Sequence, residues 1–254
     1  TCALRAPVCV HASSAREGAL ALAAADAFER AWQTLTGALA LPAPDLDPMT
    51  LVYDVFLVDR ASAATRIEPA PELAVTRMEA RDVRSRVDRA RAFTLVDRRV
   101  GRGCVLDRIA ASSLARASLL RAAPATEEGT ARAQAEYVAT LASPCAVALS
   151  VDAIHAFQSR PATAFCDLHA GDEAASIGDP LSPAGALFTR GAATFWARLD
   201  WAFGRTPGGV VPASWALHPT MTPIGVPRWH NEPDSFDVLR ATFKGALSSG
   251  GTVH

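Results

Sequence analysis

The sequence almost lacks lysine, and it has neither an excess of basic charge nor a long hydrophobic run. Lys244 is the only lysine, and the 25 basic residues are balanced by 26 acidic ones, which gives a formal net charge of −1. Nucleic-acid-binding proteins usually show a basic excess, so this class of partner is not expected. A membrane-spanning helix needs roughly 18 apolar residues in a row, and no run approaches this length, so no transmembrane segment is predicted.

The motifs of common catalytic sites are also missing. The histidines are scattered, which excludes the His-Glu-x-x-His arrangement that places two zinc ligands and a general base on one helix. There is no Gly-x-Ser-x-Gly elbow, no phosphate-binding loop and no Gly-x-Gly-x-x-Gly turn. The six histidines are His11, His155, His169, His218, His230 and His254.

Five cysteines without a Cys-x-x-Cys pair leave the redox state of the chain open. Cys2 and Cys9 flank a short segment, Cys145 and Cys166 flank a longer one, and Cys104 would be left over. Spacing does not determine connectivity, and free buried thiols are an equally good interpretation. One or two bridges would favour an exported protein with a periplasmic, cell-surface or extracellular location.

A looser metal site would use the Cys-x-x-His spacing of Cys166 and His169, with Cys145 and His155 as further ligands. These residue types suit zinc, but their spacing matches no established zinc pattern. A bridge between Cys145 and Cys166, with two ordinary histidines nearby, is the preferred interpretation.

The first hundred residues predict a few strands and one long helix. Strands are expected over residues 8–11, 51–58 and 92–96, whereas residues 59–91 could form a loop, an edge strand or a short helix. A Ser-x-x-Glu capping box formed by Ser14 and Glu17 begins the helix. Its apolar positions recur every 3.6 residues, at Leu20, Ala24, Ala27, Phe28, Ala31, Leu35 and Leu39.

From Cys104 onward the sequence predicts helices. The first covers residues 105–121, and a second follows a cap at Thr126. A single helix is expected from a cap at Ser182 to Gly204, where glycine suits a left-handed C-terminal residue. Shorter helices are expected over residues 210–217 and from residue 235.

A proline-rich loop is expected over residues 218–234. Long loops without periodic structure commonly carry function. The candidate binding residues in it are His218, Trp229, His230, Glu232 and Asp234.

Strands followed by helices indicate an α+β fold that is rich in helix. We expect residues 1–103 to form an α/β subdomain with a long helix and few strands. Residues 104–254 are expected to form a helical subdomain, and the two together make one unit.

The order of these elements resembles a zincin-like family of exported metallopeptidases known mainly from myxobacteria. The similar features are the strand ending in His11, the helix containing Ala31-Trp32, the strands VYDVFLV and AFTLVD, the helix that Cys104 begins, the run Glu128-Gly129-Thr130-Ala131, and the block from Gly185 through Trp215 to Thr242. The resemblance covers nearly the whole chain. It implies a small mixed sheet packed on an active-site helix, with a helical second half supplying a third zinc ligand.

The resemblance also implies that the metal site is lost. Active members would carry His-Glu-x-x-His on the Cys-led helix, where Ser112, Ser113 and Arg116 stand in the best register. A shift by one residue places Ser113, Leu114 and Ala117 there, and neither register retains a ligand or the base. Zinc activation of water needs three ligands and a base, so no metal cofactor is predicted. Glu128 matches the remaining glutamate, where it could pair with Arg116 or cap its own helix.

Three functional hypotheses follow. The first is an exported pseudo-peptidase that binds a peptide or protein without cleaving it. The second is a hydrolase whose site lies in the loop over residues 218–234. The third is a structural envelope protein without a ligand, which predicts no well-formed pocket beside Ser112 and Arg116.

Overall fold

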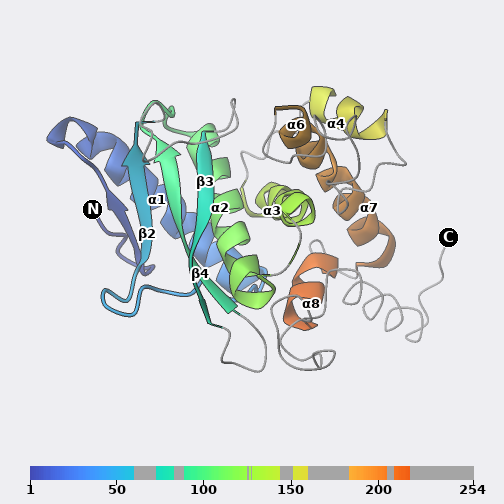
Figure 1. Ribbon diagram of the computed structural model, residues 1–254, viewed down its shortest axis with the longest axis horizontal. Helices are drawn as coiled ribbons and strands as arrows, with labels where there is room; N and C mark the ends of the chain where they lie inside the picture. The colour runs from blue at the N-terminus through green and yellow to red at the C-terminus, as the bar shows by residue number, and fades with distance from the viewer. Residues whose placement is uncertain are drawn as a thin grey trace.

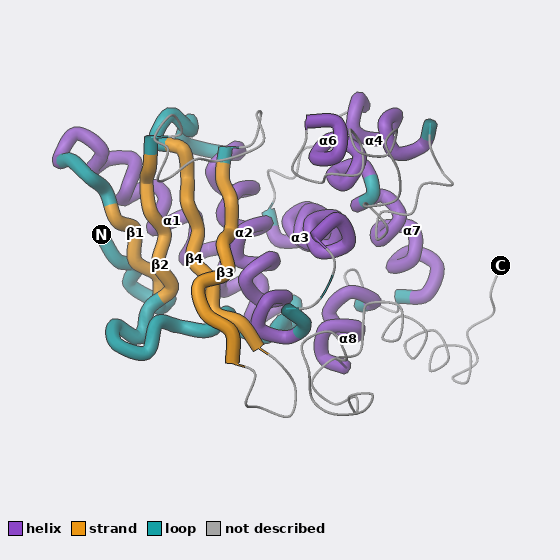
Figure 2. Tube along the Cα trace, viewed as in Figure 1, coloured by secondary structure: helices purple, strands orange, loops and turns teal. Residues whose placement is uncertain are grey.

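The computed structural model describes residues 1–59, 73–82, 89–124, 126, 128–143, 151–159, 183–204 and 209–217 (Figure 1). They form an α+β fold in which one four-stranded mixed sheet is covered by helices on one face (Figure 2). Further helices pack beyond this first helical layer. The predicted fold class is therefore confirmed at the level of α+β.

The sheet has the strand order β1-β2-β4-β3. Strands β1 (Val8–His11), β2 (Tyr53–Val58) and β4 (Arg89–Asp97) run parallel, and β3 (Ala74–Asp82) pairs antiparallel with β4 at the edge. Alternate residues along β2 are buried, because a strand directs successive side chains to opposite faces. The buried face of β2 carries Tyr53, Val55 and Leu57.

Two helices cover this face of the sheet. Helix α1 (Gly18–Gln33) continues as a π-helical turn over Thr34–Ala38, and α2 (Cys104–Ala122) follows β4 in the chain. Small alanines on both helices allow close packing against each other and against the strands. The long helix predicted to follow the cap at Ser14 and the helix predicted over residues 105–121 are thus confirmed, although α1 itself begins at Gly18.

Helix α3 (Glu128–Ala142) lies between α2 and the outer helices (Figure 1). It contacts α6 (Pro183–Gly191) and α7 (Ala193–Phe203), while α4 (Val151–Gln158) packs on α6 and α8 (Val210–Leu217) packs on α7. Two fully buried tryptophans, Trp196 on α7 and Trp215 on α8, fill this part of the core. One continuous apolar cluster extends from Val8 to Trp215, so the sheet and the helices share a core.

Strand β3 falls in the stretch 59–91, for which the sequence left three alternatives. The edge strand is the alternative that the structure adopts for Ala74–Asp82. The strands predicted over 8–11, 51–58 and 92–96 are confirmed as β1, β2 and β4, and the helix predicted over 210–217 is confirmed as α8.

The capping box predicted at Ser14 is wrong by one residue. Ser14 makes no side-chain cap bond, and the Glu17 carboxylate instead accepts hydrogen bonds from Ser13, at 2.9 Å from its backbone N–H and 3.2 Å from its hydroxyl. The first turn, Ala15–Glu17, is a 3₁₀-helix. It winds more tightly than an α-helix, so the Glu17 side chain reaches the residue before the expected cap.

The single helix predicted up to residue 203 is also wrong, because the chain breaks at Ala192 into α6 and α7. Both segments contact α3, but α6 also packs on α4, whereas α7 packs on α8. The contact with α4 is so close that a Cβ atom on Gly191 would lie 1.9 Å from the carbonyl oxygen of Ala153. Ser182, the predicted cap, lies outside the described residues.

Gly204 does not adopt the left-handed conformation that we expected. Its φ of −73° and ψ of 129° are extended. Glycine is required there for close approach instead, since a Cβ atom would lie 2.4 Å from the carbonyl oxygen of Asp200.

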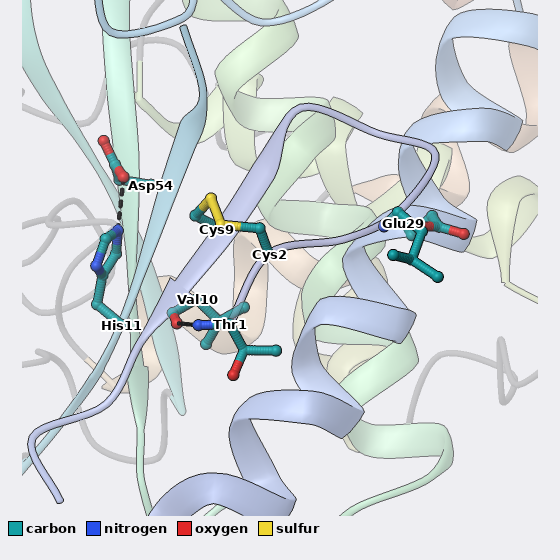
Figure 3. Close-up of a disulfide and its surroundings, with 8 residues drawn as sticks. Thr1, Cys2, Cys9, Val10, His11, Glu29 and Asp54 are labelled. Carbon is teal, nitrogen blue, oxygen red and sulfur yellow. Dashed lines mark hydrogen bonds and ion pairs between the residues drawn. A yellow bond between two sulfur atoms is a disulfide. The ribbon is translucent and has the colours of Figure 1, made fainter. Parts of the chain in front are cut away.

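Disulfides fasten two parts of the chain. Cys2 and Cys9 are bridged, a pairing that the sequence left open, and the bridge holds the N-terminal segment against β1 (Figure 3). Cys104 is also disulfide-bonded, so the expectation that it would be left over is wrong. Its partner lies outside the described residues, as do Cys145 and Cys166. Within the described part of the chain, no helix is both long and apolar enough to cross a membrane.

Candidate functional site

A pocket lies where the edge strand β3 meets helices α2, α3 and α6. It has a volume of about 70 Å³, and an adjoining hollow of about 270 Å³ continues it along α2 towards Val105. We call the two together the β3–α2 pocket. The smaller part is lined by Ala74, Val75, Thr76, Ser112, Ser113, Arg116, Arg132, Ala135, Glu136, Thr189 and Arg190. The adjoining part adds Leu73, Val105, Arg108 and Ile109.

Three of the four residues predicted at the degenerate site line this pocket. Ser112, Ser113 and Arg116 lie within one turn of α2, so helical geometry brings them to the same wall. Glu128 is the first residue of α3, and its side chain lies outside the described part of the structure. The predicted loop residues, His218, Trp229, His230, Glu232 and Asp234, also lie outside it.

A chain of hydroxyl groups joins the sheet to the wall formed by α2. The Thr76 hydroxyl donates to the carbonyl oxygen of Ser113 at 3.3 Å and lies 3.2 Å from the Thr94 hydroxyl. The Thr94 hydroxyl in turn lies 2.7 Å from the buried Tyr53 hydroxyl. Burial raises the pKa of the Tyr53 phenol, which therefore stays neutral. These bonds fix β3 against α2 at the pocket.

Among the described residues, no histidine lies beside the pocket serines to activate them as nucleophiles. A serine hydroxyl becomes nucleophilic when an adjacent base removes its proton. The Ser112 hydroxyl instead donates to the carbonyl oxygen of Ile109 at 3.3 Å, an ordinary bond within a helix.

Basic side chains dominate the polar lining. Arg116 comes from α2, Arg132 from α3 and Arg190 from α6, and the carboxylate in the lining is Glu136. Glu136 forms an ion pair with Arg108 in the adjoining hollow. Guanidinium groups only donate hydrogen bonds, and each of these three arginines already interacts with another group of the protein.

The same lining does not suit zinc. Zinc in proteins is held by His, Cys, Asp or Glu, whereas α2 presents Ser112, Ser113 and Arg116. No group of three or more such ligands exists anywhere among the residues that the structure describes. For the looser metal site, His155 is exposed on α4, and Cys145, Cys166 and His169 lie outside the described ranges.

The opposite face of the sheet carries a larger hollow of about 500 Å³. Phe56 and Phe93 form its apolar floor, with Asp54 and Glu79 at its side. Both carboxylates are engaged, because Asp54 bonds to His11 at 2.7 Å (Figure 3) and Glu79 bonds to Arg91 at 2.8 Å. Arg77 adds a basic side chain to the lining of this hollow.

Sequence reasoning missed the basic residues that other helices bring to the site. A partial signal exists on α2, where Arg108, Ser112 and Arg116 recur at four-residue intervals on a largely apolar helix. Arg132 and Glu136 show the same spacing on α3. These stripes indicate two polar helix faces, but not that the faces meet.

Comparisons with known proteins give no match to this chain. No protein-family model matches the chain, and neither a curated protein nor a solved structure is significantly similar to it.

Proposed function

We propose that this protein is an exported, non-catalytic binding domain with a zincin-like frame, and that it binds an extended peptide along the outer edge of β3. One observation carries the proposal. No described strand pairs with the outer edge of β3, and this edge runs past the β3–α2 pocket. The pocket also counts against a purely structural domain without a ligand.

The backbone of β3 offers hydrogen bonds to such a peptide. The backbone N–H of Asp97 donates to the carbonyl oxygen of Leu73 at 2.8 Å, which sets the pairing of β3 with β4. In an antiparallel ladder the backbone groups of alternate residues face opposite edges. The N–H and C=O groups of Ala74 and Thr76 therefore face the outer edge, the side on which strand addition takes place.

The other edge of the sheet is closed by the chain itself. The backbone N–H of Val10 donates to the carbonyl oxygen of Thr1 at 2.7 Å, and that of Ala3 donates to the carbonyl oxygen of Val8 at 2.9 Å. The Cys2–Cys9 bridge holds this segment in place. Open edges invite pairing with other chains, so the contrast favours a role for the β3 edge.

The residues on α2 support the proposed lack of catalysis. In the resemblance to zincin-like peptidases, Ser112, Ser113 and Arg116 replace the two zinc ligands and the base. A permanent guanidinium charge at Arg116 opposes a bound cation. The proposed export is supported by the disulfides at Cys2–Cys9 and at Cys104, which persist in oxidising compartments.

The test is a proline in β3. Ala74→Pro removes an outward N–H from the edge strand without removing a bond to β4, and Ala74→Ser keeps this N–H as the matched control. Peptides selected from a random library for binding to the wild type should bind Ala74→Pro at least about tenfold more weakly and Ala74→Ser nearly normally.

Two results would overturn the proposal. Equal binding of the peptides to Ala74→Pro and Ala74→Ser would show that the outer edge of β3 does not take part in binding. Cleavage of the selected peptides by the wild type would favour a hydrolase. Loss of that cleavage in a His230/Glu232 double variant would place the catalytic site in the loop over residues 218–234.

Equal thermal unfolding temperatures of the two Ala74 variants would show that impaired folding is not the cause of the weaker peptide binding.

A further inference from the structure

We infer that the hollow on the other face of the sheet binds a small, uncharged aromatic molecule. We call it the β2–β4 hollow, because its floor is formed by Phe56 and Val58 of β2 and by Phe93 and Leu95 of β4. It lies on the face opposite helices α1 and α2 (Figure 2). It is therefore distinct from the β3–α2 pocket, and the inference does not rest on the proposed peptide binding.

The floor of the hollow belongs to an apolar row that crosses the sheet. In the strand register, Phe56 pairs with His11 on β1 and with Leu95 on β4, and Leu95 pairs with Val75 on β3. Paired residues on neighbouring strands lie on the same face of a sheet. Val58 and Leu95 form a small apolar cluster with their neighbours, separate from the main core. Parallel strands usually have both faces covered, so an apolar row here favours a bound apolar ligand.

Three aromatic rings meet at the hollow. The His11 ring stacks on Phe56, with centroids 4.8 Å apart and planes inclined by 22°. Phe93 meets Phe56 edge to face at 5.7 Å. Both phenylalanines are only half-buried and line the hollow, so their rings offer surface to a ligand. Aromatic rings attract one another more strongly than the area they bury explains. An aromatic ligand is therefore preferred over an aliphatic one of the same size.

The charges around the hollow are balanced. The Asp54 carboxylate bonds to His11 at 2.7 Å, and the Glu79 carboxylate bonds to Arg91 at 2.8 Å. Arg77 lines the same hollow as the two carboxylates. A ligand of either charge meets both signs at the rim, and it also loses hydration beside the phenylalanines. The lining therefore favours an uncharged ligand with a polar group that reaches the rim.

The size of the hollow suits a small molecule. Its volume of about 500 Å³ lies in the range of roughly 300–1,000 Å³ that is usual for sites of this kind. The smaller part of the β3–α2 pocket has only about 70 Å³. A compound with two fused rings is in the size class that the larger hollow can hold.

The experiment uses 2-naphthol as the probe, because it is aromatic, carries one hydroxyl group and is uncharged at neutral pH. Equilibrium dialysis compares it with decahydro-2-naphthol, which has the same carbon skeleton without aromatic rings. The wild type should bind 2-naphthol at least about threefold more tightly. The anion 2-naphthoate and the cation of 2-naphthylmethylamine should both bind more weakly than 2-naphthol, because their charges lose hydration beside the apolar floor.

Phe93→Leu tests the aromatic wall, because leucine keeps an apolar side chain and removes the ring. This variant should lose most of the preference for 2-naphthol over its saturated analogue. Phe195→Leu on α7 is the matched control. Phe195 is also half-buried and meets Trp196 edge to face at 5.6 Å, but it does not line the hollow. This control should keep the preference. If Phe93→Leu does not fold, the comparison of the two compounds on the wild type remains decisive.

Each other outcome overturns the inference. Binding of neither compound would show that the hollow is not a ligand site. Equal binding of both by the wild type would remove the aromatic selectivity. Tighter binding of either charged analogue would show that the hollow selects an ion. Equal loss of the preference in Phe93→Leu and Phe195→Leu would show that the probe binds elsewhere. None of these results changes the outcome of the peptide-binding test at Ala74.

Discussion

Glu29 on α1 fixes the N-terminal segment to the body of the molecule (Figure 3). Its carboxylate accepts hydrogen bonds from the backbone N–H groups of Leu4 and Arg5, at 2.7 and 2.8 Å, and from Arg5 Nε at 2.9 Å. These bonds, first the one from the backbone of Arg5, lower the pKa of Glu29 below its ordinary value of 4.5. A buried acid on the apolar face of a helix is thus explained by a structural role.

The lowered pKa of Glu29 predicts a pH dependence of stability. The unfolded chain takes up this proton at a higher pH than the folded chain does. The contribution of Glu29 is therefore complete above the ordinary glutamate pKa of about 4.5 and is lost as the pH falls through the lower folded value. Glu29→Gln should lower the free energy of unfolding at pH 7 and make it less sensitive to pH below 4.5.

Urea unfolding at pH 7, 4 and 3 measures this effect. Asp26→Asn, at an exposed position on the same helix, is the control. It should change neither the free energy of unfolding at pH 7 nor its dependence on pH below 4.5. An unchanged acid dependence in Glu29→Gln would contradict the role that we assign to this carboxylate.

At the scale of elements, the sequence pattern predicted those helices and strands whose own apolar residues recur at the spacing of a helix or a strand. Strand β2 and helix α1 carry their apolar positions in regular order, so the periodicity of the sequence was enough to predict them. Strand β3 was not placed, because Arg77 and Glu79 are exposed and the strand depends on pairing with β4. The break between α6 and α7 was missed because a contact with α4 decides it, and this contact leaves no periodic signal.

The α4–α6 contact predicts the effect of a methyl group at residue 191. Gly191→Ala would place Cβ 1.9 Å from the Ala153 carbonyl oxygen, so the two helices must separate. We expect the free energy of unfolding to fall by about 1–3 kcal/mol, as for other overpacked positions. Gly18→Ala is the control in α1, where no atom lies within 4 Å of the added Cβ.

Both variants can be measured by thermal or urea unfolding. Gly18→Ala should be neutral or slightly stabilising, since alanine favours a helix over glycine by up to about 1 kcal/mol. Equal stability of the two variants would contradict the close contact between α4 and α6.

At the scale of the whole molecule, the candidate site forms only when distant elements meet. The resemblance pointed to Ser112, Ser113 and Arg116, which follow one another on α2. Arg132 and Arg190 could not be predicted, because tertiary packing of α3 and α6 brings them to the same pocket. The proposed binding edge is a property of the whole sheet, with one side closed by the Cys2–Cys9 segment and the other formed by β3.

The central claim is our proposal that the chain has a zincin-like frame which has lost its metal chemistry and kept a binding edge. Metal analysis of the purified protein, combined with a peptide-cleavage assay before and after chelation, tests this claim most directly. Since Ser112, Ser113 and Arg116 supply no zinc ligand, we predict substoichiometric zinc and no cleavage that depends on metal. Stoichiometric zinc, together with cleavage that chelation abolishes and zinc restores, would contradict the claim.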